Sequence, residues 1–452
     1  MRVLSDFFVI LAQNNDLVMI NMRHIVKILI VAGMLGSLLL TSCHKDVFNE
    51  NDYVKIIDEA SPVDSVDATH TWSLTQEHVY VVQADANLNA KSVIITPDNP
   101  VDNNTYGTEV LAQRAIEDGG HVTLTATVPT RLSELYAALV DADGKYTVVS
   151  FPVETTAVSF ANVASANKQQ DLKASLAQQK LVYCFEEEMP EPGDYDYNDV
   201  VLRLSREVVD SRHLKIYVEL VAVGGAKQLA AGLRMVGHQA AEIDSVTIEG
   251  GQSFDLGGSY HDMPLERMAS PMFESSSLLQ SGRNGEAFLY LFEDAHWAMG
   301  EDLDVTNQIF QRKKYNVSKS YSYNYPVLAT RTEIYHVYFK EGQDISDFTP
   351  GMFDPFVLSP YYGTVWELHC YRDREAQVTR EYSLTKSKKL PWALMIPYAS
   401  FRYPLEGVNI GFMKNGALFG AYMNFGYSFG EWAMDHTKYL DWYMNPTINQ
   451  VF

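Results

Sequence analysis

The chain has 452 residues, of which 46% are hydrophobic and 20% charged, and its formal net charge at pH 7 is -22. Such an acidic surface is repelled by nucleic acid and by anionic membrane faces, so the composition argues against both as partners. Three cysteines, Cys43, Cys184 and Cys370, are too few for a disulfide scaffold or a zinc ribbon. The length predicts two or three domains, and the 12% aromatic content favours sheets over helical bundles.

The N-terminal segment has the pattern of an export signal. Arg23 and Lys27 precede an apolar run over residues 28–40, which is too short to span a bilayer comfortably. The run ends in a lipobox, Leu40-Thr41-Ser42-Cys43. We therefore expect residues 1–42 to be a lipoprotein signal peptide, with Met22 as the true start (or Met19), and Cys43 to carry the lipid. An ordinary secretory signal or a membrane anchor is the alternative.

Residues 43–70 are acidic and polar with little periodicity, which predicts a tether behind the lipidated cysteine. The lysine and acids that follow Cys43 resemble the surface-export signals of some Gram-negative lipoproteins. The expected location is therefore the outer membrane, at the cell surface, with the periplasmic face as the alternative.

Residues 71–158 predict a small N-terminal β domain. Strands are expected at residues 78–82, 92–96, 121–129, 135–140 and 146–151, from period-2 alternation and β-branched content. The last two flank Asp141-Ala142-Asp143-Gly144, which predicts a hairpin turn. Asp141 and Asp143 are explained by turn chemistry more simply than by a cation.

Residues 159–180 are predicted to be a linker with a short helix over residues 171–176, and residues 181–452 a second β domain. Strands are expected there at residues 181–185, 200–205, 214–222, 245–248, 288–292, 333–339 and 394–396. The predicted fold class is all-β, with two sandwich or jelly-roll domains.

The densest chemical signal lies between the first two of these strands. Oxygen-bearing side chains crowd there: Glu186, Glu187, Asp194, Asp196, Asn198 and Asp199. Like charges this close repel one another, whereas Ca²⁺ takes six to eight oxygen ligands. The glycine and glutamate that would complete an EF-hand loop are missing, so we predict a hairpin-like calcium site that uses these six residues. A solvated acidic turn whose side chains bond to their own backbone is the alternative.

The same region resembles the LruC-domain lipoproteins. The motifs that carry the resemblance are Phe185-Glu186-Glu187, Gly193-Asp194-Tyr195-Asp196-Tyr197-Asn198-Asp199, Phe353-Asp354-Pro355-Phe356, Glu367-Leu368-His369, Leu390-Pro391-Trp392 and Phe401-Arg402-Tyr403-Pro404. It covers about residues 181–445. The resemblance implies an exported lipoprotein with calcium at the acidic motif, although Glu187 stands where that family usually has Asp.

The expected function is therefore a cell-surface binding, adhesion or assembly module with a glycan or protein ligand. The alternative is a carbohydrate-active or other hydrolase that uses Glu367 and His369 in acid–base catalysis. A structural polar network explains these two residues more simply. The aromatic tail, residues 422–443, is expected to be buried core rather than a sugar-stacking surface.

Overall fold

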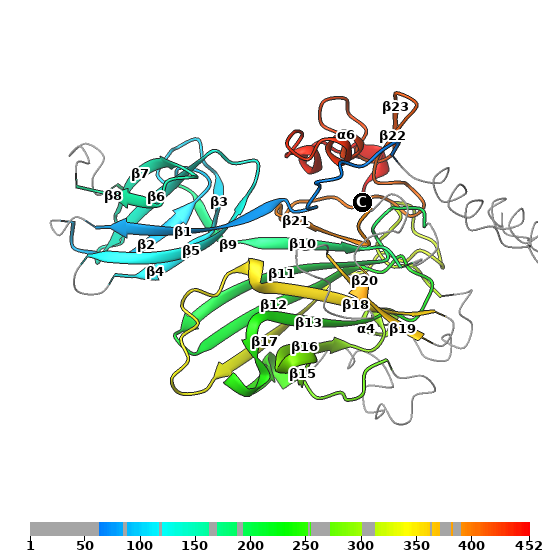
Figure 1. The fold of residues 1–452 in the computed structure, drawn as a ribbon, viewed down its shortest axis with the longest axis horizontal. Helices are drawn as coiled ribbons and strands as arrows, with labels where there is room; N and C mark the ends of the chain where they lie inside the picture. Colours follow the sequence, from blue (N-terminus) through cyan, green and yellow to red (C-terminus); the bar gives the residue numbers. More distant parts are fainter. Residues whose placement is uncertain are drawn as a thin grey trace, which may run out of the picture. The chain divides into compact units, whose positions relative to one another are not determined.

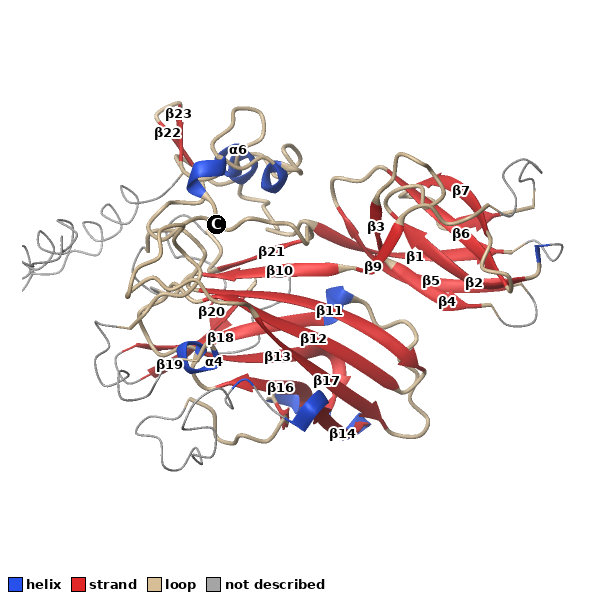
Figure 2. Ribbon diagram, turned by 180° about the vertical axis from the view of Figure 1, so that it is seen from behind, coloured by secondary structure: helices blue, strands red, loops and turns tan. Residues whose placement is uncertain are grey.

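The computed structural model describes residues 63–84, 88–116, 120–161, 170–187, 193–251, 254, 272–300, 312–361, 364–370, 381–382 and 390–452. All of them belong to one compact unit, Ile57–Phe452. The predicted signal peptide, Cys43 and most of the predicted tether lie outside the described residues. Strands dominate and helices are few and short, so the predicted all-β fold class is confirmed (Figure 2).

The first strands form three small sheets. Their members are β1 (Thr75–Gln83), β2 (Ala90–Thr96), β3 (Gly107–Val110), β4 (Ala112–Ala115), β5 (His121–Pro129), β6 (Glu134–Asp141), β7 (Tyr146–Pro152), β8 (Ala157–Ser159) and β9 (Ser175–Gln178). The sheet orders are β5-β1-β8, β4-β2-β6-β7 and β3-β9. Alternating buried side chains of these strands close one core, which includes Tyr80, Val93, Leu124 and Leu135.

The predicted helix at residues 171–176 is wrong. Ser175–Gln178 is the strand β9, and it pairs in parallel with β3. The alanine, leucine and lysine of this segment favour a helix locally, but pairing with an open strand edge outweighs that weak preference. The segment is therefore part of a sheet rather than only a linker.

Two six-stranded sheets follow, in the orders β14-β17-β12-β11-β10-β21 and β15-β16-β13-β18-β19-β20 (Figure 1). The first contains β10 (Lys180–Phe185), β11 (Val200–Asp210), β12 (His213–Ala222), β14 (Ile243–Ile248), β17 (Arg331–Phe339) and β21 (Ala393–Ile396). The second contains β13 (Ala230–Gln239), β15 (Leu279–Ser281), β16 (Glu286–Phe292), β18 (Phe353–Tyr361), β19 (Thr364–His369) and β20 (Glu381–Tyr382).

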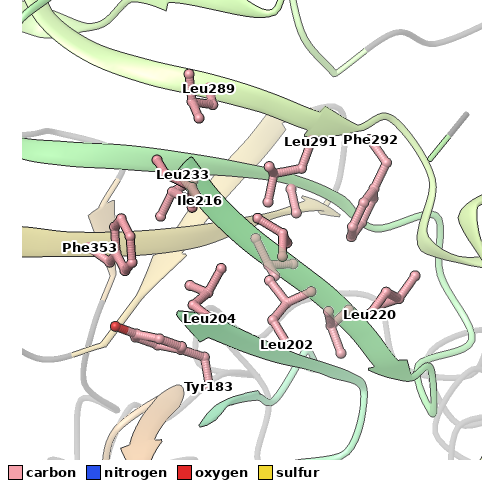
Figure 3. Packing of buried hydrophobic residues seen from close by; sticks show 14 of the residues in the cluster. Tyr183, Leu202, Leu204, Ile216, Leu220, Leu233, Leu289, Leu291, Phe292 and Phe353 are labelled. Carbon is pink, nitrogen blue, oxygen red and sulfur yellow. The ribbon is translucent and has the colours of Figure 1, made fainter. Parts of the chain in front are cut away.

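The two large sheets share one apolar core. Leu202, Leu204 and Ile216 come from the first sheet, and Leu233 and Phe353 from the second; Figure 3 shows these side chains gathered in the same interior. Each is fully buried, and such burial stabilises a fold by about 1.5–3 kcal/mol for each large side chain. The result is a sandwich, as predicted.

The other face of the first large sheet carries a second core. There Val182, Cys184 and Val201 pack with residues of the C-terminal tail. The tail contains the short strands β22 (Phe412–Lys414) and β23 (Ala417–Phe419), helix α6 (Phe429–Met434) and two 3-10 turns, η10 (Trp442–Met444) and η11 (Ile448–Gln450). The remaining short helices are η3 (Ala240–Glu242), η4 (Glu249–Gly251), η7 (Arg283–Gly285), α4 (Ala295–Ala298) and η9 (Pro350–Met352). Because β10 is covered on both faces, its side chains are buried almost without alternation.

Two further sequence predictions concern residues in this second core. Tyr422, Trp432, Trp442 and Tyr443 of the tail are buried in it, in agreement with the expectation that the tail is core. Cys184 is a buried free thiol in it, so it forms no disulfide with Cys370.

The end of the predicted tether also belongs to the fold. Val63 forms a parallel bridge with Met413, and the His70 ring stacks on Trp72 at 3.9 Å. Trp72 meets Trp432 edge to face at 5.4 Å. The division of the chain into domains at residues 71–158 and 181–452 stays a prediction.

Candidate metal centre

The acidic segment is the connection between two hydrogen-bonded strands. Phe185 at the end of β10 pairs with Val200 at the start of β11, so residues 186–199 leave the sheet and return beside their point of departure. Carboxylate oxygens of Glu186, Asp194 and Asp196 lie within 4.8 Å of one another. Calcium–oxygen bonds are about 2.3–2.6 Å long, so an ion between these oxygens would lie close to bonding distance from all three.

The backbone of this loop alternates between ordinary and left-handed conformations. Tyr195 and Tyr197 have φ of 55° and 52°, a region that residues with a Cβ adopt at a cost of about 1–2 kcal/mol. Both tyrosine rings are buried in the second core, and the Tyr197 hydroxyl donates to the Pro391 carbonyl at 2.7 Å. Burial of the tyrosines fixes the loop and offsets the strain. It also places Asp194 and Asp196 with Glu186.

A second loop fastens the carboxylates. Asp196 accepts a hydrogen bond from its neighbour Asn198 N–H on Oδ1 at 3.1 Å and one from Gly407 N–H on Oδ2 at 2.8 Å. The amide of Asn409 donates to the Asp194 carbonyl at 2.9 Å. Glu186 accepts weakly from the Tyr197 N–H at 3.4 Å. Backbone donors therefore orient the Asp196 carboxylate, and the Asn409 amide holds the backbone of Asp194.

The electrostatics of the loop favour a cation. Burial raises the pKa of Asp196 well above its usual range, and the charges of Asp194 and Glu406 raise it further. Burial likewise raises the pKa of Asp199, with Glu187 as the next cause. Each shift means that this environment disfavours the negative charge. A bound divalent ion would reverse that preference.

The remaining predicted ligands hold the loop in place. Glu187 accepts from the Ala226 N–H at 3.2 Å and pairs with Lys227 at 2.7 Å. Asp199 accepts from the Glu187 N–H at 2.6 Å. The structure therefore brings Glu186, Asp194 and Asp196 together, and gives Glu187 and Asp199 contacts with the protein itself. Their part in ligation stays a prediction.

Asn198 shares features with both the converging carboxylates and the residues that hold the loop in place. Its Nδ2 donates to the Pro404 carbonyl at 3.1 Å, while its buried Oδ1 has no hydrogen-bond partner within the described part of the chain. A Cβ added at Gly224 would lie 1.7 Å from that Oδ1, so the glycine allows the close approach. An orphaned, buried amide oxygen in the same loop as the carboxylates is a donor type that fits a hard cation.

A buried polar cluster behind the loop is not part of the sequence prediction. Arg312 donates to Asp294 at 2.6 Å, and His296 lies 3.0 Å from the Gly225 carbonyl. The Gly225 N–H in turn contacts the Asp199 carbonyl at 3.3 Å. All three side chains are buried. Burial raises the pKa of Asp294, but its interactions with His296 and Arg312 outweigh burial and lower that pKa below its usual value. Nothing in the sequence connects these residues to the acidic loop, because the link runs through backbone atoms of Gly225.

The alternative catalytic pair lies in a separate network on the second large sheet. His369 is 3.2 Å from Asp354 and 3.5 Å from Glu367, and Arg234 bonds Asp354 at 2.8 Å. Burial lowers the pKa of His369, but the Asp354 charge outweighs it and the pKa rises to about 9. His369 is 5% exposed, so this arrangement is first of all a buried ionic network.

No helix of the described residues is long and apolar enough to cross a membrane.

Comparison with known proteins gives one family. Residues 210–443 match the model of the family described as "Domain of unknown function (DUF4842)", which is slightly more than half of the chain. The match lies within the region that resembles LruC-domain proteins but carries a different family name, and it begins after the acidic loop. No curated protein matches the chain.

A solved structure is loosely similar. It is described as a "Putative lipoprotein from Bacteroides ovatus", and it aligns with 80% of this chain and 99% of its own at 13% identity and a TM-score of 0.45. At that level of similarity, no property of that protein is transferred to this one.

Proposed function

We propose that this chain, which belongs to the DUF4842 family, is an exported lipoprotein. The protein is anchored in the outer membrane by the lipid on Cys43 and is exposed at the cell surface. Its second β region holds a structural Ca²⁺ ion between β10 and β11. The molecule acts as a binding, adhesion or assembly module for a glycan or protein ligand.

The observation that carries the calcium proposal is the convergence of Glu186, Asp194 and Asp196 on one small volume. Asn198 adds an oxygen without a hydrogen-bond partner among the described residues. These four donors are all oxygen, which favours Ca²⁺ over transition metals. The ion would neutralise the loop and hold it against the Gly407–Asn409 segment.

The anchor proposal is supported by the lipobox that ends at Cys43 and by the polar residues that follow it. The resemblance of residues 181–445 to LruC-domain lipoproteins supports the same location. A Cys43→Ala variant is expected to leave the detergent phase of a Triton X-114 partition, while the wild type stays in it. Equal partitioning of the two would contradict the anchor.

A hydrolase that uses Glu367 and His369 remains the alternative, supported by the short distances that connect Asp354, His369 and Glu367. Arg234 shares the Asp354 carboxylate with His369, and that contact favours a structural role. Glycan hydrolysis by the wild type that disappears in His369→Gln, with an unchanged melting temperature, would favour the enzyme.

The calcium proposal is tested by thermal unfolding of the wild type in EGTA and in Ca²⁺. Binding to the folded state alone adds about 2.7 kcal/mol at a hundredfold excess of calcium over Kd. We expect a melting temperature several degrees higher in calcium, and no comparable increase with Mg²⁺, which demands a tighter octahedral shell. Identical melting in EGTA and in millimolar calcium would remove the ion from the proposal.

A further inference from the structure

A polar cleft lies at the opposite end of β11 from the acidic loop. Its volume is about 490 Å³, within the range of small-molecule sites. One wall is formed by β3, β4 and β5, and the other by the second half of β11 and the segment 344–348. No residue of the acidic loop contributes to it.

The two walls are held by direct contacts. The Thr349 hydroxyl donates to Glu77 at 2.9 Å, and the Gly351 N–H donates to the Thr127 hydroxyl at 2.9 Å. The amide of Gln179 donates to the Thr127 carbonyl at 2.8 Å, and this contact is buried. The cleft is therefore a formed feature of the fold.

The unusual residue of the cleft is Arg206. It lies on β11 at the same alternate positions as the core residues Leu202 and Leu204, and it is only 7% exposed. Its Nε–H donates to the Phe348 carbonyl at 2.6 Å, but no carboxylate of the described residues pairs with it. Burial lowers the pKa of Arg206 to about 10, and the charge of Glu77 only partly opposes this. A buried guanidinium without a paired anion is costly, and an anionic ligand would relieve that cost.

The rest of the lining is polar, and it carries four acids, Glu207, Asp210, Asp344 and Asp347, against one arginine, Arg114. Each acid already has a partner within the protein: Glu207 accepts from the Tyr217 hydroxyl at 2.9 Å and Asp210 from the Arg212 N–H at 2.8 Å. Arg114 at the rim pairs with Asp347 at 2.9 Å and lies 3.9 Å from Asp344. Neutral hydrogen-bonding side chains, among them Gln113, Thr125 and Gln178, supply donors and acceptors. Such a lining suits a ligand rich in hydroxyl groups, whereas Arg206 suits one carboxylate.

We propose that this cleft binds a carboxylate-bearing sugar of the uronic acid class, with its carboxylate on Arg206 and its ring hydroxyls on the neutral side chains. The inference deepens the proposed glycan-binding role of the molecule, and it is independent of the calcium site. Arginine is the side chain whose fork of donors matches a carboxylate on two bonds.

The test is a calorimetric titration of the wild-type protein with glucuronate, galacturonate, glucose, galactose and acetate. A hydrogen bond to a charged group contributes about 1.5–3 kcal/mol, so we expect a uronate to bind at least about tenfold more tightly than its neutral sugar. Acetate, which has the carboxylate without the hydroxyls, is expected to bind more weakly than either uronate. Equal affinity for glucuronate and glucose, or no heat with any uronate, would overturn the proposal.

Two variants locate the site. Arg206→Gln is expected to lose uronate affinity by about tenfold or more, for the same physical reason. Arg203→Gln is the matched control, because Arg203 lies on the same strand with its side chain on the opposite face, near Glu219 at 3.5 Å. It should bind uronate as the wild type does. Unchanged binding by Arg206→Gln would overturn the assignment.

A measurement on the wild type covers the case in which Arg206→Gln does not fold. Methyl resonances of Val110 and Val208, which line the cleft, are expected to shift saturably with glucuronate. Those of Leu289, in the core between the large sheets, should stay unchanged. Saturable shifts at Leu289 but not at Val110 or Val208 would place the ligand elsewhere. Repeating the titration in EGTA separates the two proposals, since the calcium site can fail while uronate binding persists.

Discussion

Two acidic loops of this protein connect neighbouring antiparallel strands, and they use the same residue types differently. Between β6 and β7, Asp141 accepts hydrogen bonds from the Asp143 and Lys145 N–H groups, each at 2.9 Å, and Gly144 supplies a φ of 72°. Between β10 and β11, the carboxylates of Asp196 and Glu186 are buried and converge.

The difference lies in what surrounds each loop. The hairpin turn is solvated, so its aspartates need no counter-charge and simply satisfy the local backbone. The longer loop is pinned by Tyr195 and Tyr197, whose burial pulls the intervening Asp196 away from water. Acidic composition alone therefore does not define a cation site; burial of the acids in a shared volume does.

The largest effect is expected when one aspartate in each loop is replaced by alanine. Asp196→Ala should abolish the rise in melting temperature caused by calcium, because a buried ligand is lost. Asp141→Ala should leave that rise unchanged and lower stability equally in calcium and in EGTA, by about 1 kcal/mol for the lost hydrogen bonds. Asp196→Asn, which keeps the size and loses one charge, should weaken calcium binding less than alanine does. A calcium response that survives in Asp196→Ala would end the distinction.

Replacing one glycine in each loop by alanine compares the two loops sterically, with a smaller expected effect on calcium binding. A Cβ at Gly193 would lie 2.0 Å from Glu186 Oε1, whereas one at Gly144 meets nothing within 4 Å. Displacing an oriented ligand typically weakens metal binding about 10–100-fold, and we expect such a loss in Gly193→Ala. Gly144→Ala should cost about 1–2 kcal/mol of backbone strain without changing calcium affinity. Calcium titrations of the two variants decide, and equal affinities would contradict the proposed place of Glu186.

The smallest expected effect is on pH dependence. In the calcium-free fold the pKa of Asp196 lies above its usual value, so the folded state binds that proton more tightly than the unfolded chain. Acidification from neutral pH toward the usual aspartate range should therefore stabilise the calcium-free protein through this group, and the gain by calcium should shrink. Melting curves of wild type and Asp196→Asn in EGTA isolate the contribution. The same pH slope in both proteins would show that Asp196 does not titrate in this window.

Sequence reasoning was most successful where one face of a strand is buried. The alternation in His121–Pro129 predicts β5 with its observed bounds, because every second side chain enters the core. It missed β18 (Phe353–Tyr361), which contains Pro355 and Pro360 and so reads as a non-strand segment. Ala230–Gln239 was also missed, since its small residues show no alternation that marks a strand.

At the candidate metal centre, the sequence predicts which residues crowd together but not which of them converge. That choice depends on the left-handed backbone of Tyr195 and Tyr197 and on the distant Gly407 N–H group. Neither feature has a sequence pattern. The Arg206 cleft was equally inaccessible, because the lack of a paired carboxylate at Arg206 among the described residues is a property of three-dimensional packing.

The docking of Trp72 against Trp432 has a consequence for the order of assembly. His70 contacts the Trp432 carbonyl across 362 residues of chain, so this closure waits until nearly the whole polypeptide is present. Long-range closures of this kind slow folding. A chain that emerges from its N-terminus would expose Trp72 until the last tenth of the sequence arrives, and a truncated product would keep that aromatic surface uncovered.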